Sequence, residues 1–404
     1  MTVERQPRAL GGETRDDTGV EGFVAPGFEP VADAFVRAFA GRPEMGGAVA
    51  VRVDGETVVD LWGGVADART GRAWQHDTSS VVFSCTKGLV SILAAKLVGD
   101  GLLDYDAPVA DYWPEFATAG KQHTLVKHLL SHRAGLSAPR VDLTAGDVVD
   151  WQRVIAALQG QEPLWRPGEG YAYHALTHGW LVGHVIRAVT GSTVGEYFRA
   201  AVTAPLGVDA WIGLPEAERA RLAHQSVGAT LTELIRSQTA ARDLTRPDWP
   251  DRAMTLGGAF TTALVTEHGG FNSPEVLAAE IPGAGGVATA RALAAIWSAT
   301  VVETDGVRLL DPAAVAEATR VQSEGAPVFA AAGPFPRWGM GFQLDSEARR
   351  YLTPSGFGHD GAGGQVAFAD PDLGVGFAFT TNQMEAVDDR GTSVVDALRG
   401  VLLA

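Results

Sequence analysis

The sequence predicts an α+β protein in which one antiparallel sheet is built from both ends of the chain. Strand-like segments occur close to the N-terminus and again close to the C-terminus, whereas helical periodicity dominates residues 80–300 between them. Short turns join the strand-like segments, which is typical of antiparallel neighbours. The simplest arrangement is therefore one sheet flanked by helices, with the helical middle forming a second lobe.

The N-terminal region begins with a tail and continues into a hairpin. Residues 1–20 are polar and charged without an apolar pattern, so we expect them to form a flexible tail. Segments 47–53 and 56–62 are strand-like and flank Asp54-Gly55, a dipeptide that favours a type I′ turn. These two segments therefore predict a β-hairpin.

Three helices are predicted from apolar spacing and from the residues that end them. Residues 31–41 have helical periodicity and stop at Gly41. A second helix begins near Ser84, directly after an apolar strand-like run. A third covers 175–189 and is closed by Gly191, a residue type that favours the end of a helix.

The C-terminal region returns to strands and closes with a helix. Residues 338–344, 364–369 and 374–381 alternate in polarity or run apolar, and a final helix is expected over 390–403. After the tail, we expect a single catalytic domain over 21–404. Its lobes are then a sheet lobe (21–80 and 300–404) and a helical lobe (81–299).

The composition restricts the classes of partner. The 404 residues carry a formal net charge of −16 and contain no basic run, which disfavours nucleic acid. No stretch of about 18 apolar residues exists, so no membrane association is expected. The N-terminus lacks an apolar signal segment, which predicts a cytoplasmic protein. A small molecule is the expected partner, and a homo-oligomer is compatible with the sequence.

The first candidate site is Ser84-Cys85-Thr86-Lys87, an S-x-x-K element at a helix start. Residues three apart share a helix face, so the Ser84 hydroxyl and the Lys87 amine can meet. A serine needs an adjacent base to act as a nucleophile, and a desolvated lysine can serve. The alternative is an N-cap serine followed by a solvated lysine. Cys85 is a rival nucleophile, but its position points it away from Lys87.

Two further segments carry candidate residues. Tyr173 precedes a predicted helix and could aim its phenol at a neighbouring site, or it could be a core tyrosine. His359 is followed by a glycine-rich stretch at 361–364, which allows the backbone to approach a ligand closely. The alternative for that stretch is a turn that leads into an edge strand.

In this order, the three elements resemble the serine β-lactamase and penicillin-binding-protein superfamily, with its S-x-x-K signature. The resemblance is greatest to class C β-lactamases and family VIII carboxylesterases, and it covers residues 22–400. Further segments similar to the family's signatures are His128–Leu136 (HLLSHRAGL), Pro205-Leu206-Gly207 and Gly285-Gly286-Val287.

The resemblance implies a role for each candidate residue. Ser84 is expected to be the nucleophile, Lys87 its base partner, and Tyr173 the group that passes protons to the leaving group. The N–H groups of Ser84 and Ala362 are expected to form the oxyanion hole. The segment that replaces K-T-G is expected to contact substrate through His359, Asp360, Gly361 and Gly363.

Departures from the family pattern favour an esterase. The Asn of Y-x-N is Ala175 here, and His359 and Asp360 replace the Lys and Thr of K-T-G. A lactam site uses such polar groups to hold an amide and a carboxylate, and Asp360 is expected to repel that carboxylate. The sequence therefore predicts hydrolysis of short-chain carboxylic esters through a Ser84 acyl-enzyme.

Other functions stay open at this point. A transacylase of secondary metabolism could use the same acyl-enzyme, and a weak β-lactamase or a catalytically silent binding protein could share the fold. The expected ester hydrolysis needs no cofactor. No metal is expected either, because His174 and His178 have the spacing of a ligand pair but no evident third ligand. The G-x-S-x-G motif of α/β-hydrolases is missing from the sequence.

Overall fold

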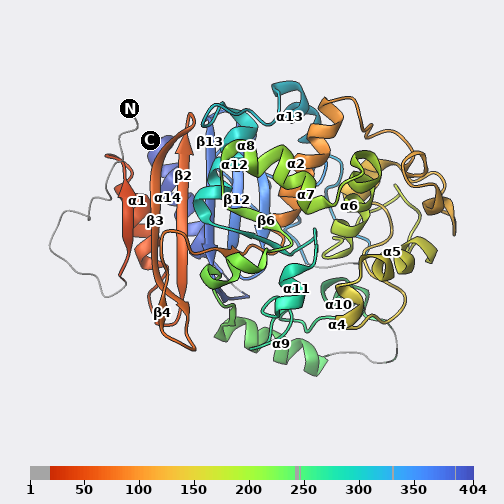
Figure 1. Ribbon diagram of the computed structural model, residues 1–404, viewed down its shortest axis with the longest axis horizontal. Helices are drawn as coiled ribbons and strands as arrows, with labels where there is room; N and C mark the ends of the chain where they lie inside the picture. Colours follow the sequence, from red (N-terminus) through yellow and green to blue (C-terminus); the bar gives the residue numbers. More distant parts are fainter. Residues whose placement is uncertain (1–18, 242–244, 246, 330–331, 387) are drawn as a thin grey trace.

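The computed structural model describes residues 19–241, 245, 247–329, 332–386 and 388–404. A twisted sheet with helices on both faces forms one side of the molecule, and a mostly helical lobe forms the other (Figure 1). Most of the predicted tail, residues 1–18, lies outside the described residues. Among the described residues, no helix combines the length and the apolar character needed to cross a bilayer.

The large sheet joins both ends of the chain, as predicted. Its strand order is β1-β3-β2-β13-β12-β11-β10-β9, with β4 paired to β3, and every pairing is antiparallel. The N-terminal β2 and the C-terminal β13 are neighbours at its centre, where Val49 lies opposite Phe379. The strands are β1 (Glu21–Val24), β2 (Gly46–Val53), β3 (Glu56–Asp67), β4 (Arg72–Ala73), β9 (Arg337–Trp338), β10 (Gln343–Leu344), β11 (Phe357–Gly361), β12 (Gln365–Asp370) and β13 (Val375–Thr381).

The two faces of this sheet belong to different cores because side chains alternate along each strand. Val49 and Phe379 face one core, whereas Ala50 and Ala378 face the other. The small alanines allow a helix to approach the second face closely. The first core contains α1 (Glu29–Arg37) and α14 (Arg390–Leu402), and the second contains α2 (Cys85–Gly99) and α12 (Ala290–Val301).

The helical lobe surrounds α2 and carries short strands that the sequence did not predict. Its helices are α3 (Val126–Leu130), α4 (Ala145–Val148), α5 (Trp151–Gly160), α6 (Thr177–Thr190), α7 (Val194–Phe198), α8 (Ala204–Leu206), α9 (Ala229–Ala241), α10 (Trp249–Thr255) and α11 (Pro274–Ala278). A three-stranded sheet contains β5 (Ser80–Val81), β8 (Gly286–Ala288) and β6 (Ala210–Ile212), in that order. A parallel pair joins β7 (Ser226–Val227) to β14 (Gln383–Met384).

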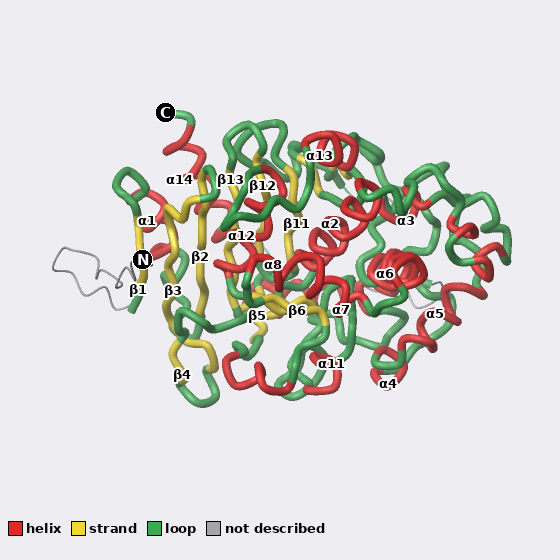
Figure 2. Tube along the Cα trace, turned by 45° about the horizontal axis from the view of Figure 1, so that its top comes forward, coloured by secondary structure: helices red, strands yellow, loops and turns green. Residues whose placement is uncertain are grey.

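Three predictions need correction. Helix α12 begins within the expected helical lobe (81–299) and ends at Val301, but it packs on β2, β12 and β13, as both views show (Figures 1 and 2). The single strand expected over 338–344 is two short strands, β9 and β10, because Gly341 between them has a positive φ of 83°. The helix expected over 31–41 is α1, which ends at Arg37. A further helix, α13 (Pro312–Ala318), precedes β9 in the chain and packs on α2.

The close contact between α12 and β13 depends on Gly376 and gives a stability prediction. A methyl group on Gly376 would lie 2.3 Å from the Ala294 carbonyl oxygen and 2.4 Å from the Ser298 nitrogen. Gly376→Ala should therefore lower the free energy of unfolding by about 1–3 kcal/mol, the usual effect of overpacking. Urea unfolding followed by circular dichroism measures this change.

Gly400→Ala in α14 is the matched control, because a methyl group on Gly400 would have no other group within 4 Å. Alanine favours a helix, so this variant should be more stable than the parent by about 0.5–1 kcal/mol. An unchanged or raised stability of Gly376→Ala would contradict the packing of α12 on the sheet.

Candidate active site

Ser84 lies at the N-terminus of α2, after a sharp turn of the backbone. Phe83 has a positive φ of 43° and is fully buried, where it packs edge-on against Phe271 with ring centroids 5.6 Å apart. A bulky residue with positive φ is strained, and such strain persists where the surroundings enforce it. The turn leaves Ser84 partly exposed between buried neighbours, so its hydroxyl is accessible to a ligand.

Lys87 follows one turn later, and its amine lies next to the serine. Nζ is 2.9 Å from Ser84 Oγ and donates to the Gly283 carbonyl oxygen at 2.6 Å. Gly283 can come this close because α6 presents Gly179 to it: a methyl group on Gly179 would lie 1.9 Å from the Gly283 nitrogen. The side chain of Lys87 is fully buried and forms no ion pair with a carboxylate in the described part of the chain.

The burial of Lys87 sets the chemistry of its amine. Burial lowers the pKa of Lys87 well below its usual value, because a charged ammonium is poorly solvated there. The neutral amine has a lone pair that can accept the proton of Ser84 Oγ. The S-x-x-K spacing thus produces the pair of groups that it predicted, at hydrogen-bonding distance.

Tyr173 completes the group from the segment that precedes α6. Its ring centroid is 5.0 Å from Lys87 Nζ, and its ring stacks on Trp338 with centroids 5.3 Å apart. Burial raises the pKa of Tyr173 above its usual value, and an interaction with the Ser84 side chain partly offsets this effect. The phenol therefore stays protonated at neutral pH and can pass on a proton.

His132 fixes the position of Tyr173 and was not singled out from the sequence. It accepts a hydrogen bond from the His174 N–H at Nδ1 (3.2 Å), and its carbonyl accepts the Ala172 N–H (3.2 Å). These two bonds hold the backbone on both sides of Tyr173, and the two rings meet edge-on at 4.9 Å. The sequence signal that could have identified His132 is its place in the segment His128–Leu136, which resembles the family. That segment does not reveal which residues His132 bonds to.

The glycine-rich segment comes close to Ser84 through Gly361. A methyl group on Gly361 would lie 2.3 Å from the Val82 carbonyl oxygen, so only glycine fits. Within the described residues, neither the N–H of Ser84 nor that of Ala362 donates to another group of the protein. Two free N–H groups at this position can stabilise the negative oxygen of a tetrahedral intermediate.

His359 and Asp360 face opposite sides of strand β11. The His359 ring lies 6.1 Å from the Tyr173 ring, and burial lowers its pKa to about 3, so the imidazole is neutral. Asp360 instead pairs with Arg349, at an N–O distance of 3.0 Å. The expectation that Asp360 repels a substrate carboxylate therefore needs correction, because the Arg349 guanidinium balances its charge.

Ala175 and Cys85 are both buried and pack against other groups of the protein. Ala175 contacts Ala138 and Ala253 in a small apolar cluster next to Tyr173, where the family has an amide. The Cys85 thiol is buried and donates to the His359 carbonyl oxygen at 3.0 Å, and burial raises its pKa well above the usual value. A thiol of this kind is a poor nucleophile.

His174, one of the two histidines with the spacing of a ligand pair, is hydrogen-bonded within the protein. His174 Nδ1 donates to the Ala172 carbonyl oxygen (2.7 Å), and Nε2 accepts the Leu136 N–H (3.1 Å), so both ring nitrogens are occupied. Across the described ranges, no group of three or more His, Cys, Asp or Glu side chains is arranged to hold a metal ion.

The chain is similar to known proteins over most of its length. The family model described as Beta-lactamase matches residues 32–399. Esterase/beta-lactamase LipL of Mycobacterium tuberculosis is 36% identical over 394 residues, which cover 93% of this chain and 86% of the relative.

Two solved structures have the same fold over nearly the whole chain. A family VIII carboxylesterase has a TM-score of 0.82 and 34% identity, and the alignment covers 95% of this chain and 100% of that one. A penicillin-binding protein homologue from Caulobacter crescentus has a TM-score of 0.84 and 34% identity, with the same coverage. These findings confirm the resemblance and the fold class that the motifs indicated. The chain belongs to the β-lactamase family.

Proposed function

We propose that the protein is a serine carboxylesterase that hydrolyses short-chain esters through an acyl-enzyme on Ser84. The observation that carries this proposal is the buried Lys87 amine, 2.9 Å from Ser84 Oγ. A buried neutral amine beside a partly exposed hydroxyl is the arrangement that activates a serine. The names of the relatives support the same enzyme class, since they include an esterase/beta-lactamase and a family VIII carboxylesterase.

The first half of the proposed reaction transfers the acyl group to Ser84. Lys87 Nζ takes the proton from Ser84 Oγ as Oγ bonds to the ester carbonyl carbon. The carbonyl electron pair moves to its oxygen, which the N–H groups of Ser84 and Ala362 stabilise. Collapse of this intermediate breaks the ester C–O bond. The departing alkoxide receives a proton from the Tyr173 phenol, which regains one from the Lys87 ammonium.

The second half hydrolyses the acyl-enzyme. The Tyr173–Lys87 pair accepts a proton from a water molecule as the water oxygen bonds to the acyl carbon. The same two N–H groups stabilise the second tetrahedral intermediate. The bond to Ser84 Oγ then breaks, the acid departs, and the proton held by the pair returns to Oγ. Both halves use the same two groups alternately as base and acid.

The surroundings of the nucleophile favour an ester over a lactam. Ala175 supplies a methyl group where a lactam site supplies an amide, and its neighbours Ala138 and Ala253 are apolar. His359 is neutral, so no cation from this position meets a substrate carboxylate. A short ester requires neither group. A weak β-lactamase activity is a second candidate, because the relative LipL carries both activities in its name.

The nucleophile is tested by paired substitutions at neighbouring positions. Ser84→Ala should lower kcat/KM for p-nitrophenyl acetate by at least about 10³-fold. Catalytic residues that act as a unit lose nearly all of their effect when the nucleophile is removed. Cys85→Ala is the control and should keep at least about a tenth of the activity, because a buried thiol mainly packs. A serine-directed phosphonate should add mass to the peptide that contains Ser84, and labelling of Cys85 instead would contradict the assignment.

The pH dependence should report the amine of Lys87. Catalysis needs the neutral amine, so kcat/KM should be lost as pH falls through the Lys87 pKa and should be constant above it. Burial places this pKa well below 10.5, and the raised pKa of Tyr173 extends the plateau at high pH. A pH–rate profile with p-nitrophenyl acetate measures the midpoint. His359→Gln is the control and should leave the midpoint in place, because His359 has a pKa of about 3. A midpoint that moves with this variant, or one near 10, would refute the role of Lys87.

The substrate class is tested by comparing an ester with a lactam at one pH and one salt concentration. We expect turnover of p-nitrophenyl acetate and butyrate, with kcat/KM for nitrocefin lower by at least about 10²-fold, because the polar anchors of a lactam site are missing. Ala175→Asn should narrow this gap if the apolar cluster causes it. Equal or faster cleavage of nitrocefin by the parent protein would favour the β-lactamase alternative.

A further inference from the structure

The turn that carries Ala362 contains three glycines and cannot be rigid by itself. Gly363 and Gly364 have positive φ angles of 81° and 109°, and Gly361 precedes them. Glycine populates many backbone conformations, so a turn of this composition needs outside contacts to hold one of them. An oxyanion donor is effective only when its position is fixed before the reaction. Groups outside the turn must therefore hold it in place.

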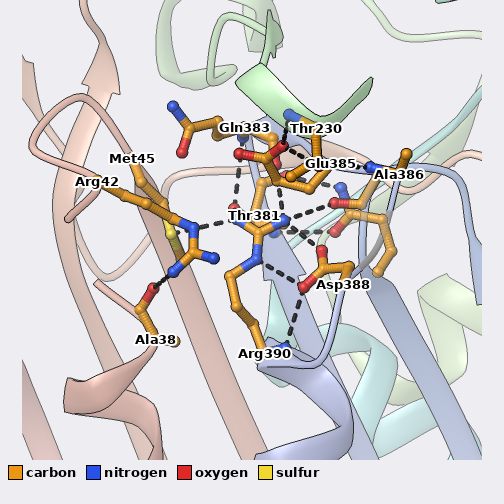
Figure 3. Close-up of polar contacts among 12 residues, drawn as sticks. Ala38, Arg42, Met45, Thr230, Thr381, Gln383, Glu385, Ala386, Asp388 and Arg390 are labelled. Carbon is orange, nitrogen blue, oxygen red and sulfur yellow. Dashed lines mark hydrogen bonds and ion pairs between the residues drawn. The ribbon is translucent and has the colours of Figure 1, made fainter. Parts of the chain in front are cut away.

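Arg390, the first residue of α14, makes the most direct contact with the turn. Its guanidinium donates to the carbonyl oxygens of Gly363 and Gln383, each at 2.8 Å. The same group contacts the Met45 sulfur at 3.2 Å, and Figure 3 shows it at the centre of these polar contacts. Only 1% of the Arg390 side chain is exposed, so it cannot bind a substrate directly.

Asp388 neutralises Arg390 and lies against the turn. It accepts from Arg390 Nε at 2.8 Å and forms an ion pair with the guanidinium (Figure 3). A methyl group on Gly364 would lie 1.8 Å from Asp388 Oδ2, so the backbone of the turn packs directly against this carboxylate. The guanidinium fork therefore joins one side of the turn to Asp388 and to the Gln383 backbone.

A second arginine holds the other side of the turn to the same helix. Asp360 pairs with Arg349 at 3.0 Å, and Arg349 Nη1 donates to Thr392 Oγ1 at 2.9 Å. Thr392 is two residues after Arg390 in α14. Ala362 thus lies between two connections, Asp360 and Gly363, that both lead to the first turn of one helix.

We propose that Arg390 is a positioning residue for catalysis: together with Asp388 it holds the Gly361–Gly364 turn so that the Ala362 N–H points at the oxyanion. The inference rests on the proposed function, in which that N–H stabilises the tetrahedral intermediate. Arg390 acts through the backbone of Gly363 and does not touch the substrate. Its loss should slow the chemical step more than it weakens substrate binding, because the oxyanion forms only in the transition state.

Arg390→Lys tests this proposal with limited disturbance of the fold, since the positive charge opposite Asp388 is kept. A lysine is a single point donor and cannot bond Gly363, Gln383 and Asp388 together. We expect kcat for p-nitrophenyl acetate to fall by about 10–100-fold with KM changed by less than about threefold, since loss of one oxyanion donor costs about 10²–10³-fold. Phosphonate labelling of Ser84, which forms a similar tetrahedral adduct, should slow by a comparable factor.

Arg399→Met is the matched control on the same helix. Arg399 Nε donates to the Tyr351 carbonyl at 2.7 Å and so also fixes α14, but it does not contact the turn. This variant should lose stability and keep kcat within about twofold, because its anchoring role is structural alone. If Arg390→Lys does not fold, as judged by circular dichroism, Asp388→Asn replaces it with the same expected split between kcat and KM.

The outcomes separate this inference from the function on which it rests. A kcat within twofold of the parent for Arg390→Lys, a loss confined to KM, or an equal kcat loss in Arg399→Met would overturn the positioning role. If instead Ser84→Ala stays active or the phosphonate labels another residue, the proposed function itself fails. A lower kcat in Arg390→Lys, together with an inactive Ser84→Ala, supports both the positioning role of Arg390 and the proposed function.

Discussion

The proposed chemistry of this protein depends on one arrangement, a buried amine beside a hydroxyl. Lys87 is fully buried, and its hydrogen-bonding partners are Ser84 and the Gly283 carbonyl rather than a carboxylate. A buried ammonium without a counter-charge is costly, so the environment favours the neutral amine. The neighbouring His359 is held neutral by the same burial, and Tyr173 stays protonated. In the proposed mechanism the nucleophile is activated because Lys87 is buried without a carboxylate partner.

Keeping that environment intact requires contacts from several distant parts of the chain. The small sheet holds the start of α2, where the Val82 N–H donates to the Gly286 carbonyl and the Gly286 N–H donates to the Thr86 hydroxyl. The loop at Gly283 reaches Lys87 because α6 lacks a side chain at Gly179. Glycines recur at these points since backbone must approach backbone, and a methyl group would separate the groups that react.

The acidic side chains that adjoin the turn carrying Ala362 are each paired with an arginine. Asp360 is balanced by Arg349, and Asp388 is balanced by Arg390. Asp360 belongs to the strand that leads into the turn, and Arg390 donates to the Gly363 carbonyl within it. A buried ion pair contributes little net stability, but the Arg390–Asp388 pair defines the geometry of the turn through the hydrogen bonds of its guanidinium. In this protein we infer that the geometry so defined is the position of an oxyanion donor, while the lining near Ala175 stays apolar and suits an uncharged ester.

The sequence by itself determined the order of the elements and the main candidate residues. The Asp54-Gly55 hairpin formed as predicted, with positive φ at both residues, and the S-x-x-K spacing brought Ser84 and Lys87 together. These features are local, so periodicity and spacing are sufficient to predict them. The sequence could not predict the role of His132, the partner of Asp360, or the contact of Arg390 with Gly363. The contacts of Arg390 with Gly363 and of His132 with His174 join residues 27 and 42 positions apart. Only the folded chain decides them, because burial and long-range approach, rather than residue type, fix which groups meet and whether they are charged.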